Sequence, residues 1–391
     1  MLIISFDAVG DCDLDRLMAL PAFSKFYKES AVFRGIPTLC PSNTYPIHTS
    51  VATGVLPKDH GIISNTKPFP ELHPWWIVRE SKIRAKTIWQ AAYERGIDVA
   101  AVFWPVTGFS KTIRYNIPEI MPRPGVHPLF ALLKAGSRRL LLKVAIRHHK
   151  LLDGIKQPNR DCFAAMGMAD ILRKHKPGLA MMHLTAFDAL SHANGRGDAA
   201  LNTACESLDR NLALLLDAAG NDRDVLIFSD HCQRDVHTVL DPNKTLVENG
   251  LLTRKETAYA AGESGCYFEC CGGTAFFHAG KLNNERIDAL REEVRQSEGF
   301  RRFLTQGEMR DSGYERVAFG FSAADGYSYA SLKPGHKSDH GYPPDMPDYE
   351  VFYMARGFGL KAGSITQGGS LLDIAPLMAK ALGCEGVGMA V

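Results

Sequence analysis

The chain has almost no excess of charge of either sign. Lys and Arg total 45 and Asp and Glu total 43, a formal net charge of +2 over 391 residues. No global field therefore favours nucleic acid or a membrane, and an anionic ligand has to be attracted locally. The first apolar run, residues 2 to 6, is far too short to span a bilayer. We expect no transmembrane segment and no stable nucleic-acid partner.

A disulfide framework is missing as well. Nine cysteines, an odd number, are scattered without regular spacing. The adjacent Cys270 and Cys271 have no second pair to complete a soft-metal site, so we expect a structural role for them. The chain begins at Met1 with no basic segment and no cleavage site. These features favour a reduced, soluble protein in the cytoplasm.

The sequence does contain enough apolar material for a sizeable core. Hydrophobic residues make up 45% of it, which suits one large α/β domain with an insertion. Continuous apolar runs predict buried strands at residues 2–6, 99–103, 178–184, 225–228 and 349–354. Apolar residues spaced three to four apart, and glycines at which a helix can end, predict helices at residues 87–96, 201–215, 284–296 and 371–382.

One basic segment allows two interpretations. Between residues 125 and 157, Lys and Arg are interspersed with Leu, Val and Ile, which predicts a single basic amphipathic helix. Such a helix can bind a membrane surface or steer anions. We favour the other interpretation, a solvated helix face on a lid.

Thr44 lies between Pro41 and Pro46, and the polar residues elsewhere in the chain suggest a function for it. By itself such a threonine is a turn residue, and its hydroxyl becomes a nucleophile only with a base, a lowered pKa or a metal. Several apolar runs end in Asp or His, and ionised Asp is rarely buried unless it is paired or bound to metal. Six such ligands would hold two metal ions; they are Asp7, Asp188, His192, Asp230, His231 and His340.

The segments next to Thr44 add possible phosphate contacts. Residues 48–54 can begin a helix directly behind the hydroxyl, so that backbone N–H groups point at an anion. Asn65 follows a glycine-containing loop, where an Asn is usually a turn former. Asp188 and His192 are four residues apart, which puts them on one helical face or in one tight loop.

These motifs together resemble the type I phosphodiesterase/nucleotide pyrophosphatase branch of the alkaline phosphatase superfamily. The resemblance runs from Asp7 to about Gly357, and its motifs stand here as Asp7, Thr44-Tyr-Pro46, Thr53 to Asn65, Asp188 to His192, Asp230-His231 and His340-Gly-Tyr342. It implies an α/β fold, an alkaline-phosphatase-like wound sheet sandwiched by helices. Residues 1–232 and 335–391 would form the catalytic domain, and residues 233–334, which match no motif, a small inserted cap subdomain.

The resemblance also implies two zinc ions per chain. One would be held by Asp7, Asp230 and His231 and bridged to Thr44. The other would be held by Asp188, His192 and His340, with His336 close enough in sequence to replace His340. Asn65 corresponds to an amide that hydrogen-bonds a phosphoryl oxygen.

The function implied is a metal-dependent hydrolase that cleaves phosphodiester or pyrophosphate bonds through a threonine phosphoryl intermediate. Its partner would be a small phosphate ester, with nucleotides among the candidates. Alternatives on the same scaffold are a phosphomonoesterase, a phosphonate (phosphonoacetate-type) hydrolase and a sulfatase; a non-catalytic metal-stabilised binding protein is the alternative from another class. We expect diesters to be cleaved better than monoesters, because the loops near Thr44 offer no basic side chain other than histidine.

Overall fold

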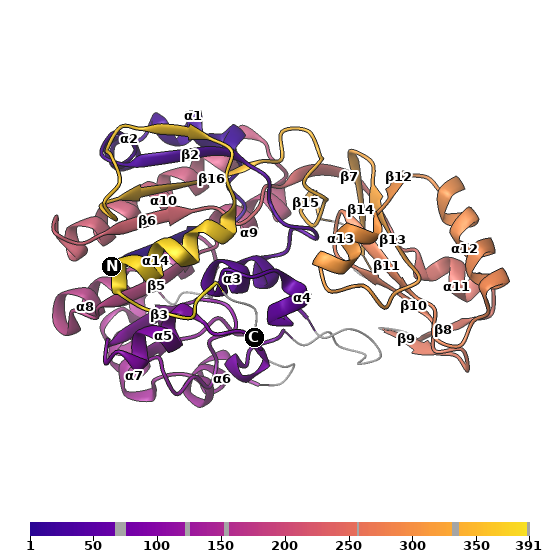
Figure 1. The fold of residues 1–391 in the computed structure, drawn as a ribbon, viewed down its shortest axis with the longest axis horizontal. Helices are drawn as coiled ribbons and strands as arrows, with labels where there is room; N and C mark the ends of the chain where they lie inside the picture. Colours follow the sequence, from indigo (N-terminus) through magenta and orange to yellow (C-terminus); the bar gives the residue numbers. More distant parts are fainter. Residues whose placement is uncertain (67–75, 122–125, 152–155, 256–257, 331–335, 389–391) are drawn as a thin grey trace.

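A computed structural model describes residues 1–66, 76–121, 126–151, 156–255, 258–330 and 336–388. The predicted end of the cap, residue 334, and two parts of the predicted basic helix, residues 125 and 152–155, lie outside the described residues. The described chain forms a mixed α/β structure with a larger lobe around a central sheet and a smaller lobe beside it (Figure 1).

The central sheet has eight strands in the order β17-β2-β16-β6-β1-β5-β3-β4. Strand β16 is antiparallel to β2 and β6, and the other pairs are parallel. The buried apolar runs become β1, β5 and β6 at its centre, as predicted. The strand bounds are β1 Leu2–Phe6, β2 Ala31–Ile36, β3 Val99–Val102, β4 Tyr115–Ile117, β5 Leu179–Leu184, β6 Val225–Phe228, β16 Val351–Arg356 and β17 Ile365–Gln367.

Helices cover both faces of this sheet, which confirms the expected fold class (Figure 1). Successive side chains of β1 alternate between the two cores: Leu2, Ile4 and Phe6 pack on one face and Ile3 on the other. The first face is covered by α1 Leu14–Met18, α2 Pro21–Lys28, α7 Arg138–Arg147, α8 Asn159–His175, α9 Ala186–Asn194 and α10 Asp198–Ala219. The second is covered by α3 Thr44–Thr53, α5 Ile88–Glu94 and α14 Ile374–Leu382.

The smaller lobe belongs to the segment predicted as a cap. A four-stranded antiparallel sheet in the order β10-β11-β13-β12 packs with two of its helices around one apolar core. Its elements are β8 Leu252–Lys255, β9 Ala258–Ala261, β10 Tyr267–Cys270, β11 Thr274–His278, β12 Phe300–Phe303, β13 Phe319–Ala323, α11 Asn243–Glu248, α12 Asn284–Gln296 and α13 Gln306–Asp311. A three-stranded sheet joins the lobes and contains β7 Arg234–Leu240, β14 Gly326–Tyr329 and β15 Ser338–Asp339. The proposed domain boundaries stay a prediction.

The single basic helix predicted for residues 125–157 is wrong. The described part forms two helices, α6 Pro128–Ala135 and α7, separated at Gly136. The backbone of this break is tied to β4, because Ser137 N–H donates to Asn116 O over 2.8 Å. A Cβ on Gly136 would lie 2.7 Å from Asn116 O and from Pro118 Cδ, so only glycine fits this close approach.

Candidate functional site

Two neighbouring parallel strands bring the first group of predicted ligands together. Strand β1 pairs with β6, and Asp7 follows one strand while Asp230 and His231 follow the other. One atom from each residue can reach a common point, since the three ligand atoms lie within 4.8 Å of one another and all three residues are buried. His231 Nε2 is 3.5 Å from Asp7 Oδ1 and 3.4 Å from Asp230 Oδ2.

Thr44 lies against this group. Its Oγ1 is 3.2 Å from His231 Nε2, and the side chain is 5% exposed. Helix α3 begins at Thr44 itself, four residues earlier than the sequence indicated. The hydroxyl therefore sits at the positive end of a ten-residue helix, where negative charge is favoured.

The carboxylates of this group lack sufficient partners. Asp230 Oδ1 accepts from the N–H groups of Ala8 and His231, but Asp230 Oδ2 and Asp7 Oδ1 are buried without a hydrogen-bond partner among the described residues. Burial, followed by repulsion from Asp230 and Asp188, raises the pKa of Asp7 well above its ordinary value. Burial is also the main cause that raises the pKa of Asp230 to about 7. Two buried acidic groups with unpaired oxygens are typical of a place that takes a cation.

The second predicted group adjoins the first. Helix α9, which follows β5, carries Asp188 and His192, and the distance from His192 Nε2 to Asp188 Oδ1 is 3.2 Å. His340 follows β15, and its ring stacks on His231 with centroids 4.2 Å apart. Asp188, His231 and His340 form one possible ligand triad, and His192, Asp339 and His340 form another. His231 thus lies between the two groups.

Backbone carbonyls orient both histidines of the second group. His192 Nδ1 donates to Ser338 O over 2.7 Å, and His340 Nδ1 donates to Ser42 O over 3.0 Å, so Nε2 of each ring is the atom that could bind a metal. Nε2 of His192 is paired with Asp188 in this structure. Burial lowers the pKa of His340 to about 3, so its ring is neutral at pH 7. His336, the alternative to His340, has its Nδ1 2.7 Å from His192 Nδ1.

Asn65 hydrogen-bonds the residue that follows Thr44. Its Oδ1 accepts from Tyr45 N–H over 2.8 Å. Because only the oxygen of an amide can accept, this bond fixes the orientation of the side chain and leaves its NH₂ group as a donor.

Sequence reasoning missed two buried histidines that lie beside the carboxylates. His183, in β5, places Nε2 3.0 Å from Asp7 Oδ2. His48, in α3, lies near Asp230 Oδ2 at 3.5 Å, but its Nδ1 donates to Thr44 O over 2.8 Å, and burial lowers the pKa of its ring, which is therefore neutral. Both are fully buried. The available signal for His183 was a lone polar residue in the apolar run LAMMHL, which alone is compatible with simple core packing.

Sequence reasoning also missed Arg160, in α8. It donates to Thr185 Oγ1, and its charge opposes the effects of burial and of Glu119, which raise the pKa of the buried Tyr45 hydroxyl. A cation therefore lies near the residue that follows Thr44. The sequence prediction concerned only the loops next to Thr44, and Arg160 belongs to α8, which comes from a distant part of the sequence.

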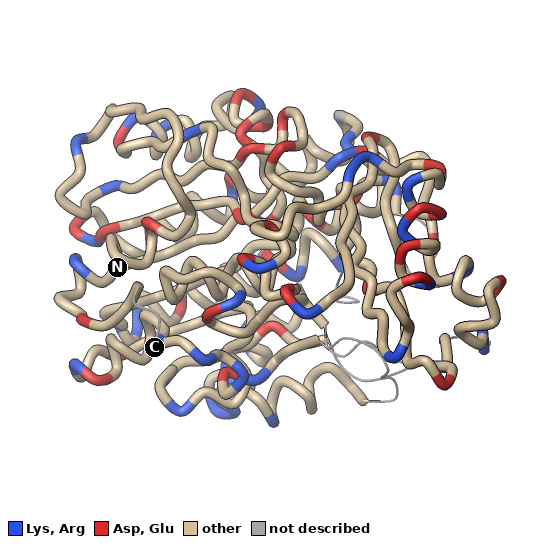
Figure 2. The backbone as a smooth tube through the Cα atoms, turned by 45° about the vertical axis from the view of Figure 1, so that its right-hand side comes forward, with Lys and Arg blue, Asp and Glu red and all other residues tan. Residues whose placement is uncertain are grey.

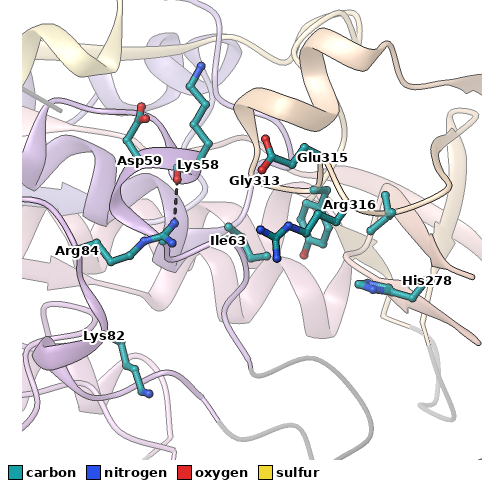
Figure 3. Close-up of a pocket in the computed structure, with 12 residues that line it drawn as sticks. Lys58, Asp59, Ile63, Lys82, Arg84, His278, Gly313, Glu315 and Arg316 are labelled. Atoms are coloured by element: carbon teal, nitrogen blue, oxygen red, sulfur yellow. Dashed lines mark hydrogen bonds between the residues drawn. The ribbon is translucent and has the colours of Figure 1, made fainter. Parts of the chain in front are cut away.

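A pocket of about 600 Å³ lies between the two lobes, next to the Asn65 loop. Its walls come from α4 (Pro57–His60) and the following loop on one side, and from the segment after α13 on the other (Figure 3). Arg84 and Arg316 occupy opposite walls (Figure 3). The charged lining residues are Lys58, Asp59, Lys82, Arg84, Glu315 and Arg316, an excess of two positive charges.

Comparison with known proteins identifies the family. Residues 1–310 match the family model of the type I phosphodiesterase / nucleotide pyrophosphatase. The chain belongs to this family. Ectonucleotide pyrophosphatase/phosphodiesterase family member 1 is 21% identical over 223 residues in Mus musculus and 21% identical over 204 residues in Homo sapiens. These matches cover 54% and 51% of this chain but only 21% and 19% of the relatives, so the chain spans about a fifth of their length.

Solved structures of the same family share the fold. Murine and human ectonucleotide pyrophosphatase/phosphodiesterase 5 superpose with TM-scores of 0.68 and 0.69 at 16% identity, covering 99% of this chain and 95% of theirs. An inactive variant of the murine protein in complex with AMP has a TM-score of 0.68. In the described part of this chain, no helix is long and apolar enough to cross a membrane.

Proposed function

We propose that this member of the family is a metal-dependent hydrolase that cleaves phosphodiester or pyrophosphate bonds with Thr44 as the nucleophile. One observation carries the proposal: the Thr44 hydroxyl lies at a helix N-terminus, 3.2 Å from His231, in a group that also contains the unpaired carboxylate oxygens of Asp7 and Asp230. These oxygens supply the acceptors that a divalent cation requires.

The donor set fits two zinc ions. Mixed carboxylate and imidazole ligation suits zinc, and the second group offers the Nε2 atoms of His192 and His340 together with Asp188. We assign Asp7, Asp230, His231 and Thr44 to one ion and Asp188, His192 and His340 to the other. When bound, such ions lower the pKa of a coordinated hydroxyl and neutralise charge on phosphoryl oxygens.

In the proposed reaction Thr44 attacks the substrate and Asn65 binds a phosphoryl oxygen. Thr44 Oγ1 gives up its proton to solvent and forms a bond to phosphorus while the bond to the leaving ester oxygen breaks, which gives a threonine phosphoryl intermediate and releases the leaving group. The NH₂ group of Asn65 donates to a non-bridging oxygen, since its own oxygen is held by Tyr45 N–H. Water then attacks phosphorus, breaks the bond to Thr44 Oγ1 and restores the hydroxyl.

The substrate we favour is a diester with a nucleotidyl group, supported by the family and by the AMP complex of the murine relative. We propose that one of the two groups esterified to phosphorus occupies the pocket between the lobes. The excess of positive charge in this pocket favours an anionic group there. A monoesterase is the second candidate. Arg160, near Tyr45, favours it, because monoesterases commonly pair the additional charge with an arginine.

The proposal is tested with p-nitrophenyl phosphate and bis(p-nitrophenyl) phosphate at one pH and one zinc load. We expect a higher kcat/KM for the diester, and a loss of at least about a thousandfold in Thr44→Ala. Thr53→Ala is the matched control, because Thr53 is a buried threonine at the other end of α3. Thr44→Ala activity within tenfold of wild type would contradict the nucleophile, and a tenfold monoester preference would favour the second candidate.

We also propose a cytoplasmic location. All nine thiols are free in the structure, which is typical of a reducing compartment. Fractionation of cells that express the tagged chain would test the location, and recovery outside the cytoplasm would contradict it.

A further inference from the structure

Exposed apolar side chains concentrate on one short segment of the larger lobe. Eight large hydrophobic side chains are exposed among the described residues, and five of them lie between residues 121 and 146. They are Met121 (52% exposed), Val126 (43%), Phe130 (69%), Leu142 (44%) and Ile146 (73%). Single exposed apolar residues are normal, but such a concentration marks an interaction surface.

The same segment has charge of one sign only. Residues 121–151 contain seven Lys or Arg residues and no Asp or Glu. Arg147 pairs with Asp170 over 3.2 Å. Lys134, Arg139 and Lys143 form no ion pair with any residue that the structure describes, and all three are exposed. Their charge is therefore available to a partner.

Helix α7 has one face buried in the larger lobe and one face exposed. Leu141 and Val144 are buried in the core of the larger lobe. The outer face carries Arg139, Leu142, Lys143, Ile146 and Arg147, which follow the spacing of a single helical stripe. The apolar and cationic side chains are thus interleaved on one exposed face. In Figure 1 α6 and α7 form the lower edge of the larger lobe, and Figure 2 shows Lys and Arg along that edge.

We infer that the α6–α7 surface, defined by Phe130, Lys134, Arg139, Leu142, Lys143, Ile146 and Arg147, docks on an anionic lipid bilayer. Interfacial helices combine apolar side chains that enter the headgroup boundary with cations that contact lipid phosphates. Each Lys or Arg near such a surface contributes about 1 kcal/mol. A two-fold contact with a second copy would instead bring the same cations together. Charge complementarity therefore selects the lipid surface, and because the net charge of the chain is only +2, the attraction has to come from a local cluster such as this one.

The test is co-sedimentation of the zinc-loaded full chain with vesicles in 0.1 M salt. We expect binding to phosphatidylcholine vesicles that contain 30% phosphatidylserine and no binding to pure phosphatidylcholine. Phe130→Ser/Ile146→Ser and Arg139→Gln/Lys143→Gln should each lower the partition coefficient at least tenfold. The control variants are Ile365→Ser and Lys28→Gln/Lys361→Gln, which change exposed residues elsewhere and should bind like wild type.

Three results would overturn the inference: no binding to the anionic vesicles, equal binding to both vesicle types, or an equal loss in the control variants. A dimer in sedimentation velocity that Phe130→Ser/Ile146→Ser dissociates would also overturn the inference, because the surface would then bind a second copy of the chain. Phe130→Trp gives a readout independent of the loss variants, because its added fluorescence should shift to the blue with anionic vesicles only.

Discussion

His183 is the residue whose replacement tests the candidate site most directly. Its ring is fully buried between two carboxylates, with Nε2 3.0 Å from Asp7 Oδ2 and Nδ1 3.6 Å from Glu119 Oε2. Burial alone lowers the pKa of His183, but Asp7 and Glu119 outweigh it, and the pKa is raised well above its ordinary value. We therefore treat His183 as a cation that compensates the negative charge of Asp7 and Glu119 beside the first group of ligands.

His183→Leu replaces this cation with an apolar side chain and leaves Asp7 and Glu119 unpaired. Breaking a buried ion pair from one side typically costs about 3–5 kcal/mol. Some of that cost is avoided if a carboxylate takes up a proton, so we expect the free energy of unfolding of the metal-free protein to fall by about 3 kcal/mol. The residue that orients a metal ligand commonly contributes about 10–100-fold to metal affinity, and we expect zinc affinity to fall by that factor.

Two assays separate these effects. Urea unfolding of the metal-free protein at pH 7.5 gives the loss of stability, and competition with a chromophoric chelator gives the loss of zinc affinity. His183→Gln keeps a donor for Asp7 and should lose less than half as much, while Met182→Leu controls for packing in the same strand. Stability within 1 kcal/mol of wild type and zinc affinity within twofold, both in His183→Leu, would refute the role of His183.

Three further predictions concern metal, pH and substrate. Chelation should abolish activity and added zinc should restore it, and elemental analysis should find about two ions per chain. One ion per chain in fully active protein would show that one of the two assigned metal sites is wrong. Burial, aided by Arg84, lowers the pKa of His60 to about 3, so the unfolded chain binds a proton below pH 6.5 that the folded chain does not. The free energy of unfolding should therefore fall by about 3 kcal/mol between pH 8 and pH 4.5 from His60 alone. Urea unfolding of His60→Gln should show a weaker dependence of stability on pH, and the same dependence as in wild type would contradict this. Arg316→Gln should raise KM about threefold or more for a nucleoside triphosphate. It should leave kcat/KM for bis(p-nitrophenyl) phosphate unchanged. Equal effects on the two substrates would contradict the assignment of the pocket as an anion site.

The central strands and the residues that follow them could be predicted because both depend on local patterns. Continuous apolar runs are compatible with strands buried on both faces, and the carboxyl ends of parallel strands share one edge of the sheet. The observed register pairs Phe6 with Leu184 and Ser5 with Phe228. Asp7 and the segment at Asp230 therefore emerge side by side, which the sequence pattern already implied.

The supporting residues could not be predicted, because their roles depend on the register and on long-range packing. His183 is opposite Ser5 in the pairing of β1 with β5, and only this register puts it beside Asp7. Arg160 comes from α8, more than a hundred residues after Thr44, and no local motif connects the two. The break at Gly136 likewise depends on Asn116, a residue in another element.

The smaller lobe reaches the candidate site through the position of His340. Gly341 has φ +87°, and a Cβ there would lie 1.6 Å from Cys271 O, so the chain passes directly over the Cys271 carbonyl. Gly273 N–H donates to His340 O over 2.7 Å, and Cys271 N–H donates to Thr274 O over 2.8 Å. The turn after β10 therefore holds the backbone of His340 while Ser42 O orients its ring. This contact gives the buried Cys271 a structural role, and it couples the placement of the lobe to the geometry of the proposed second metal group.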